Sequence, residues 1–154
     1  MLSKKRYWRG ALIIIFIIIL GCATTPEPTQ PIITDKIFSA PKSKVWEATM
    51  AALTEMGATI RTIDKDSGII TTQEVGFPTE RIRELARVTP PHGILGTIWY
   101  ETNYQMNIYE KSSASNQTQV KVTTKIRAKS KGWFDFDSNG NLERTLFDKI
   151  QKNL

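Results

Sequence analysis

Residues 98–128 read IWYETNYQMNIYEKSSASNQTQVKVTTKIRA and contain the clearest structural pattern in the chain. At both ends of this stretch apolar side chains occur at every second position, as in a strand with one buried face. These positions are Tyr104, Met106 and Ile108 in the first half and Val120, Val122, Thr124, Ile126 and Ala128 in the second. Residues 111–117 between them are polar and suit a turn. The pattern predicts two long antiparallel strands with one face toward a core.

Shorter patterns flank this pair of strands. A strand is expected over residues 32–38, followed by a helix from Pro41 to about residue 56 whose apolar face places Trp46 in the core. Strands at 58–63 and 69–73 enclose a tight turn. A short helix over 79–87 and a last helix from Asn141 to the chain end complete the set.

The order of these elements predicts an α+β domain over residues 32–154. Its expected architecture is an antiparallel sheet with two main helices packed on one face, because period-two strand faces and period-3.6 helix stripes must bury one another. This length suits one domain.

Residues 1–21 have the pattern of a secretory signal. Four basic residues within the first ten precede ten uninterrupted apolar residues, 11–20. A membrane-spanning helix needs about 20 such residues. The motif that follows, Ile19-Leu20-Gly21-Cys22, resembles the lipobox of bacterial lipoproteins. The alternative is a buried thiol at the end of an uncleaved anchor.

The lipobox resemblance implies cleavage between Gly21 and Cys22, a thioether-linked diacylglycerol on Cys22 and acylation of the new amino terminus. It also implies attachment to the periplasmic face of the outer membrane in a Gram-negative host, because Ala23 rather than Asp follows the cysteine. Several acyl chains anchor a protein stably where one does not. Residues 22–31 are rich in Pro and Thr and predict an extended tether.

The charge of the chain is concentrated in this leader. The sequence has 21 Lys and Arg against 15 Asp and Glu, a formal charge of +6, but without the four basic residues of the leader 17 remain against 15. So small an excess does not create a field that gathers polyanions. A nucleic-acid partner is therefore not expected.

Three segments of the predicted domain resemble the opening of the helix-grip domains in BamC-type envelope lipoproteins. They are residues 39–46 (SAPKSKVW), 52–57 (ALTEMG) and 64–71 (DKDSGIIT). The resemblance implies a helix-grip-like fold and concerns packing and turns more than function. BamC itself has two such domains, whereas one is predicted here.

The sequence favours a non-enzymatic protein without a cofactor other than the covalent lipid. His92, the single histidine, lies in a Pro-Pro-His-Gly loop, and after lipidation no cysteine remains as a nucleophile. No phosphate-binding glycine motif or zinc-type cluster of ligands occurs.

One string resembles half of a calcium loop. Asp135, Asp137 and Asn139 alternate before Gly140, but the twelfth position is Leu146 in place of a bidentate Glu, and Glu143 is a poor substitute. We therefore predict no metal. The alternative to a calcium loop is a polar turn that caps the last helix through Ser138, Asn139 or Asn141.

The remaining candidate surface is a cationic face on the second long strand. Lys121, Lys125, Arg127 and Lys129 point to the same side of it, where they could contact an anionic partner or simply be solvated. Taken together, the sequence predicts a lipid-anchored periplasmic interaction or scaffold module that binds an envelope protein. The alternative is a carrier that binds a lipid or hydrophobic ligand between sheet and helix.

Overall fold

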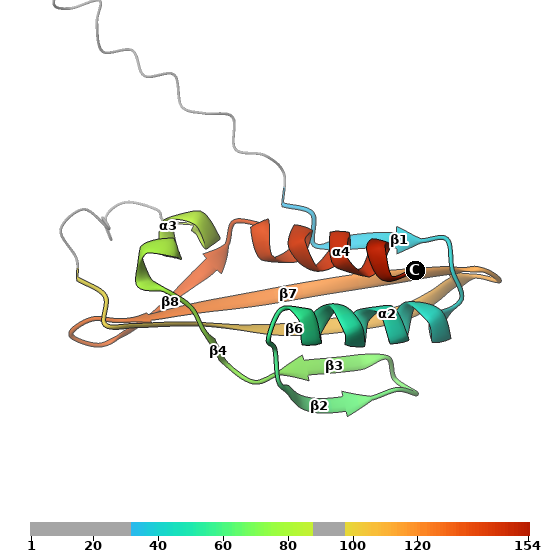
Figure 1. Cartoon of the computed structure of the whole chain (residues 1–154), viewed down its shortest axis with the longest axis horizontal. Helices are drawn as coiled ribbons and strands as arrows, with labels where there is room; N and C mark the ends of the chain where they lie inside the picture. The colour runs from blue at the N-terminus through green and yellow to red at the C-terminus, as the bar shows by residue number, and fades with distance from the viewer. Residues whose placement is uncertain (1–31, 88–97) are drawn as a thin grey trace, which may run out of the picture. The chain divides into compact units, whose positions relative to one another are not determined.

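The computed structural model describes residues 32–87 and 98–154, and the two long strands form its centre. Strand β6, Glu101–Ala114, pairs antiparallel with β7, Gln117–Lys129, from Glu101 opposite Lys129 to Ala114 opposite Gln117. Figure 1 shows the two strands side by side along the domain. The turn between them is shorter than the predicted 111–117, because β6 continues to Ala114.

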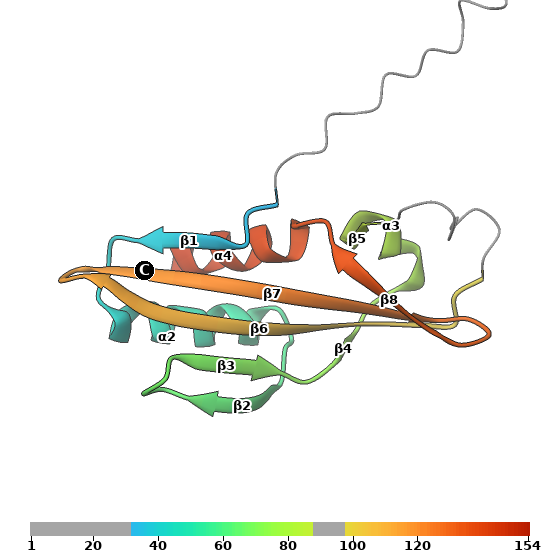
Figure 2. The ribbon, with the colours of Figure 1, turned by 180° about the vertical axis from the view of Figure 1, so that it is seen from behind.

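Shorter strands extend the sheet on both sides of this pair, and all pairings are antiparallel. The hairpin of β2, Ile60–Asp64, and β3, Ile69–Thr72, adds to β6, as does β4, Val75–Gly76. On the other side β1, Asp35–Phe38, and β8, Trp133–Ser138, share the edge of β7, and β5, Ala86–Arg87, adds to β8. Figure 2 shows the hairpin and β1 on opposite sides of the long pair.

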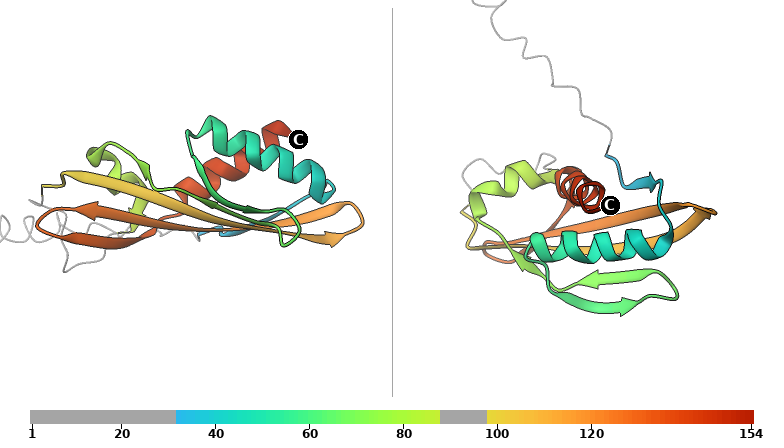
Figure 3. Two further views of the ribbon diagram at one scale, coloured as in Figure 1. Left: turned by 90° about the horizontal axis from the view of Figure 1, so that it is seen from below. Right: turned by 45° about the vertical axis from the view of Figure 1, so that its right-hand side comes forward.

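The helices lie on one face of this eight-stranded sheet (Figure 3, left). They are α2, Lys42–Glu55, the single-turn α3, Ile82–Leu85, after a 3-10 turn at Thr79–Arg81, and α4, Asn141–Asn153. The α+β class and the antiparallel sheet are confirmed. The sheet is larger than the sequence predicted. The short helix expected over 79–87 is present as the 3-10 turn and α3, but residues 86–87 belong to β5.

The core lies between the helices and the sheet. The alternating residues of β6 and β7 face the helical stripes, where Trp46 is buried as predicted, together with Leu53, Met106 and Phe147. Strands β4, β5 and β8 were not predicted. Two-residue strands carry no periodicity, and the Asp and Asn content of residues 135–141 favours a loop over a strand. Within the described ranges no helix is long and apolar enough to cross a membrane.

Candidate functional site

The sheet face opposite the helices is uncovered in the described domain, and we call it the open face (Figure 3, left). Residues directly opposite in an antiparallel ladder share a face, so the register identifies its members. Large apolar side chains on it are exposed: Ile37 lies opposite Gln119, Ile69 opposite Tyr109, and Trp133 opposite Lys129. Ile37 is 55% exposed, Ile69 41%, Tyr109 45% and Trp133 40%.

The four predicted cations all lie on the open face, because they alternate with the buried residues of β7. Two of them have anionic partners that the sequence did not suggest. Arg127 donates to Glu74 at 3.0 Å and to Asp135 at 3.2 Å, and Lys129 lies 3.9 Å from Glu101. Both also lie over the ring of Trp133, at 4.7 and 5.5 Å from its centre. For Lys121 and Lys125 no ion pair occurs within residues 32–87 and 98–154.

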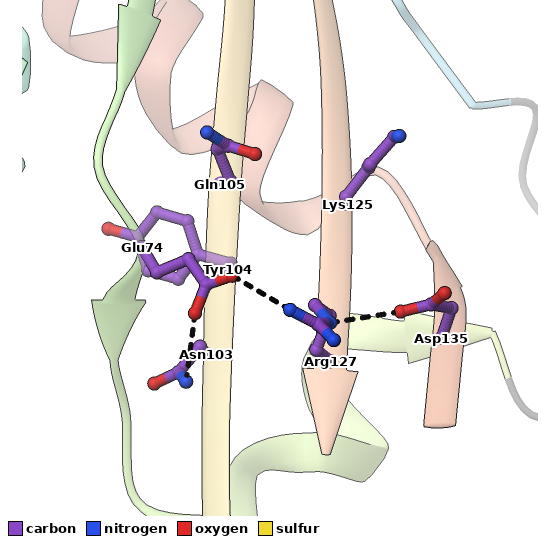
Figure 4. Close-up of a pocket in the computed structure, with 7 residues that line it drawn as sticks. All are labelled: Glu74, Asn103, Tyr104, Gln105, Lys125, Arg127 and Asp135. Carbon is purple, nitrogen blue, oxygen red and sulfur yellow. Dashed lines mark hydrogen bonds and ion pairs between the residues drawn. The ribbon is translucent and has the colours of Figure 1, made fainter. Parts of the chain in front are cut away.

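Arg127 lies at the centre of a shallow polar depression of about 220 Å³. Figure 4 shows its guanidinium between the carboxylates of Glu74 and Asp135, with Asn103 donating to Glu74 from β6. The hydrogen bond to Glu74 is the main reason that the pKa of Arg127 is raised above its ordinary value. Lys125, Gln105 and Tyr104 complete the lining.

The side chains that line this depression can form ion pairs and hydrogen bonds with a polar partner. Two cations and two carboxylates offset each other's charge, and the side-chain amides of Asn103 and Gln105 provide further donors and acceptors. A second depression of about 410 Å³ lies beside β8, and its apolar wall consists of Phe134 and Phe136, which lie opposite the buried Ala128 and Ile126 and therefore on the helix side of the sheet. The open face itself combines its charged and amide groups with the exposed apolar side chains described above, as protein interfaces do.

The calcium-like string forms a strand in place of a loop. Asp135 and Asp137 both belong to β8, where they lie opposite Arg127 and Lys125 on β7. Asn139 is directed elsewhere, since its amide donates to the carbonyl oxygen of Glu84 at 2.7 Å. In the part of the chain that the structure describes, no group of three or more His, Cys, Asp or Glu residues is placed to hold a metal.

The start of the last helix differs in part from the predicted cap. Gly140 is the N-cap of α4 and no side chain caps it directly. Ser138 instead accepts from the Gly140 N–H at 3.1 Å and donates to the buried Glu143 at 2.7 Å, while Asn139 accepts from the Asn141 N–H at 3.1 Å. Glu143 is thus an internal hydrogen-bond acceptor.

The core contains a buried carboxyl group that was not among the residues predicted to be functional. Glu110 of β6 is 1% exposed, and its Oε1 lies 2.5 Å from the hydroxyl of Thr49 on α2. Burial raises its pKa from 4.5 to about 7, against smaller lowering effects of Thr49 and Lys42. The sequence did indicate this burial, because Glu110 continues the every-second-residue pattern of Tyr104, Met106 and Ile108 and therefore lies on the same face of β6.

Other predicted positions lie outside the described residues. They are Gly21 and Cys22, the signal segment 1–21, the tether 22–31, and His92. Lipidation of Cys22 therefore stays a prediction.

No protein-family model and no curated protein matches this chain. Among solved structures it is similar to the adenylate sensor from AMP-activated protein kinase, crystallised with the ribofuranotide ZMP. That match has 17% identity and a TM-score of 0.46, and covers 75% of this chain and 94% of the other. A similarity this low says nothing about function.

Proposed function

We propose that this protein is a lipid-anchored, non-enzymatic interaction module of the bacterial envelope, and that its open face binds another envelope protein. The observation that carries this proposal is the uncovered face itself. Four large apolar side chains and a set of charged and amide groups lie on one side of a sheet whose other side is buried. Three of these side chains, those of Ile37, Ile69 and Tyr109, lie in neighbouring rows of the ladder beside Lys121, and exposed apolar side chains rimmed by polar groups are typical of protein interaction sites.

The anchoring part of the proposal depends on the resemblance of residues 19–22 to a lipobox. The finer fold assignment, a helix-grip-like domain similar to those of BamC-type lipoproteins, is supported by the order of its elements and by α2 and α4 lying on one face. The eight-stranded sheet is larger than that resemblance implies.

The packing of the core favours an interaction module over a carrier. A carrier needs space between sheet and helices for its ligand. Here the side chains of Trp46, Met106 and Phe147 are buried in that region, with exposures of 5% or less.

A photo-crosslinking experiment in intact cells tests the proposal. A photoreactive amino acid at Thr123, exposed on the open face between Lys121 and Lys125, should give an adduct of discrete mass with one envelope protein. The same amino acid at Glu47, exposed on α2, should not give that adduct.

Charge reversal defines the contribution of the cations. Lys121→Glu with Lys125→Glu should reduce the Thr123 adduct several-fold, since charged groups at the rim of an interface guide association. These two lysines are chosen because reversal at Arg127 or Lys129 would also break ion pairs within the domain. Lys44→Glu with Lys65→Glu, exposed positions away from the open face, is the matched control. Equal adducts from Thr123 and Glu47, or no effect of reversal at low salt, would contradict the open-face site.

A further inference from the structure

Thr49 has one hydroxyl hydrogen but two neighbouring acceptors. Its Oγ1 lies 2.9 Å from the carbonyl oxygen of Val45, one turn earlier in α2, and 2.5 Å from Oε1 of Glu110. A hydroxyl donates one hydrogen bond and accepts up to two. If Glu110 were ionised, its carboxylate and the Val45 carbonyl would compete for the same hydrogen.

A proton on Glu110 resolves this competition. A protonated carboxyl group can donate to the Thr49 oxygen, and Thr49 can then donate to Val45, so that each hydrogen has one acceptor. The second oxygen, Oε2, is buried and has no hydrogen-bond partner in the described structure. A neutral carboxyl tolerates this far better than a carboxylate does, because burying unpaired charge is costly.

We infer that Glu110 is held as a neutral carboxylic acid in the folded protein and that it latches α2 to β6 only while it keeps its proton. Its position suits a latch. The side chain reaches α2 through Thr49, while its backbone N–H donates to the carbonyl oxygen of Gly68 at 2.8 Å, in the turn between β2 and β3. One residue thus contacts a helix, a central strand and a hairpin turn.

Lys42 of α2 is the charged group that acts on Glu110. Its ammonium donates to the carbonyl oxygens of Lys65 and Asp66 at 3.0 and 3.2 Å, so it holds the same hairpin turn. The other neighbours, Val45 and Thr49 of α2, Gly68 of the turn and Val120 opposite on β7, carry no charge. Within residues 32–87 and 98–154 Lys42 forms no ion pair with Glu110, so loss of the proton leaves a buried carboxylate without a counter-ion in contact.

The pH range of the latch follows from the sign of the pKa shift. The folded pKa of about 7 exceeds the ordinary 4.5, so the folded state binds the proton more tightly than the unfolded state. The stabilisation is fully present below about pH 4.5 and is lost as the pH rises through about 7. The latch closes in acid and opens above neutrality.

A titration of the full chain in detergent micelles tests the protonation state. The ¹³C resonance of the Glu110 carboxyl, assigned through its own backbone, should titrate with a midpoint near pH 7. A midpoint near 4.5, the ordinary value, would overturn the inference. This measurement requires no variant.

Glu110→Gln tests the latch, because an amide can donate to Thr49 but cannot ionise. The wild-type Tm, relative to that of Glu110→Gln, should fall by about 5–10 °C between pH 5 and pH 8.5. Hydrogen exchange, corrected for its intrinsic pH dependence, should show at least about tenfold lower protection at residues 42–46 and 64–68 at the higher pH in wild type alone. Glu47→Gln, the same change at an exposed site of α2, should behave as wild type. The same pH dependence in Glu110→Gln as in wild type would refute the latch.

Discussion

Gly68 shows how a single residue constrains the junction of hairpin and sheet. Its φ of +73° lies in the region that favours glycine, and a Cβ built there would collide with the carbonyl oxygen of Glu110. The close approach lets Glu110 donate its backbone N–H to Gly68. Both a strained dihedral angle and a lack of space therefore exclude other residues at this position.

A comparison of two glycine variants separates these causes. Gly57 has a similar φ of +70°, but nothing lies within 4 Å of a Cβ built on it. Gly57→Ala should lower the free energy of unfolding by about 1 kcal/mol through strain alone, and Gly68→Ala by about 3 kcal/mol through strain and collision. Urea denaturation measures both. Equal losses would mean that the β2–β3 turn moves away from β6 at little cost.

At the scale of elements, the last helix is stabilised mainly by its packing. One stripe of α4 is buried, formed by Leu142, Leu146, Phe147 and Ile150. Phe147 contacts Phe38 of β1 with ring centres 6.2 Å apart, so this helix also covers the first strand. A 13-residue helix is marginal by itself, and tertiary contacts supply most of its stability.

Truncation of Leu146 should therefore destabilise the whole domain. The side chain is fully buried, and Leu146→Ala should lower the free energy of unfolding by about 3 kcal/mol through lost burial and the cavity left behind. Leu154→Ala, the same change at a position 41% exposed, should cost less than about 0.5 kcal/mol. Thermal unfolding followed by circular dichroism compares the two. A small effect at Leu146 would show that α4 adds little to the cooperative core.

At the scale of the whole molecule, the proposed location depends on lipidation of Cys22. Cys22→Ser should abolish lipid attachment, because a hydroxyl is a far weaker nucleophile than a thiolate. Labelling cells with radioactive palmitate should mark the wild-type protein and a Thr24→Ser control but not the Cys22→Ser variant, which should persist as a precursor. Wild-type labelling of Cys22→Ser, or a mature chain that still begins at Met1, would refute both lipidation and the proposed localisation.

The order of residues alone predicted the long strands, the hairpin and both main helices. Each shows a repeat that local geometry imposes, every second residue in β6 and β7 and every third or fourth in α2 and α4. Where the repeat was misinterpreted, as in β8, it was nevertheless present: Phe134 and Phe136 alternate with Asp135 and Asp137.

Only the tertiary structure decided which charges meet and which are buried. The cations of β7 were predicted from the sequence, but Glu74 and Asp135 reach Arg127 from segments 53 and 8 residues away in the chain. Glu110 becomes a core residue because α2 and the Gly68 turn close over it, and no local repeat specifies that contact. Periodicity is a property of neighbouring residues, whereas ion pairing and burial depend on which distant segments the fold brings together.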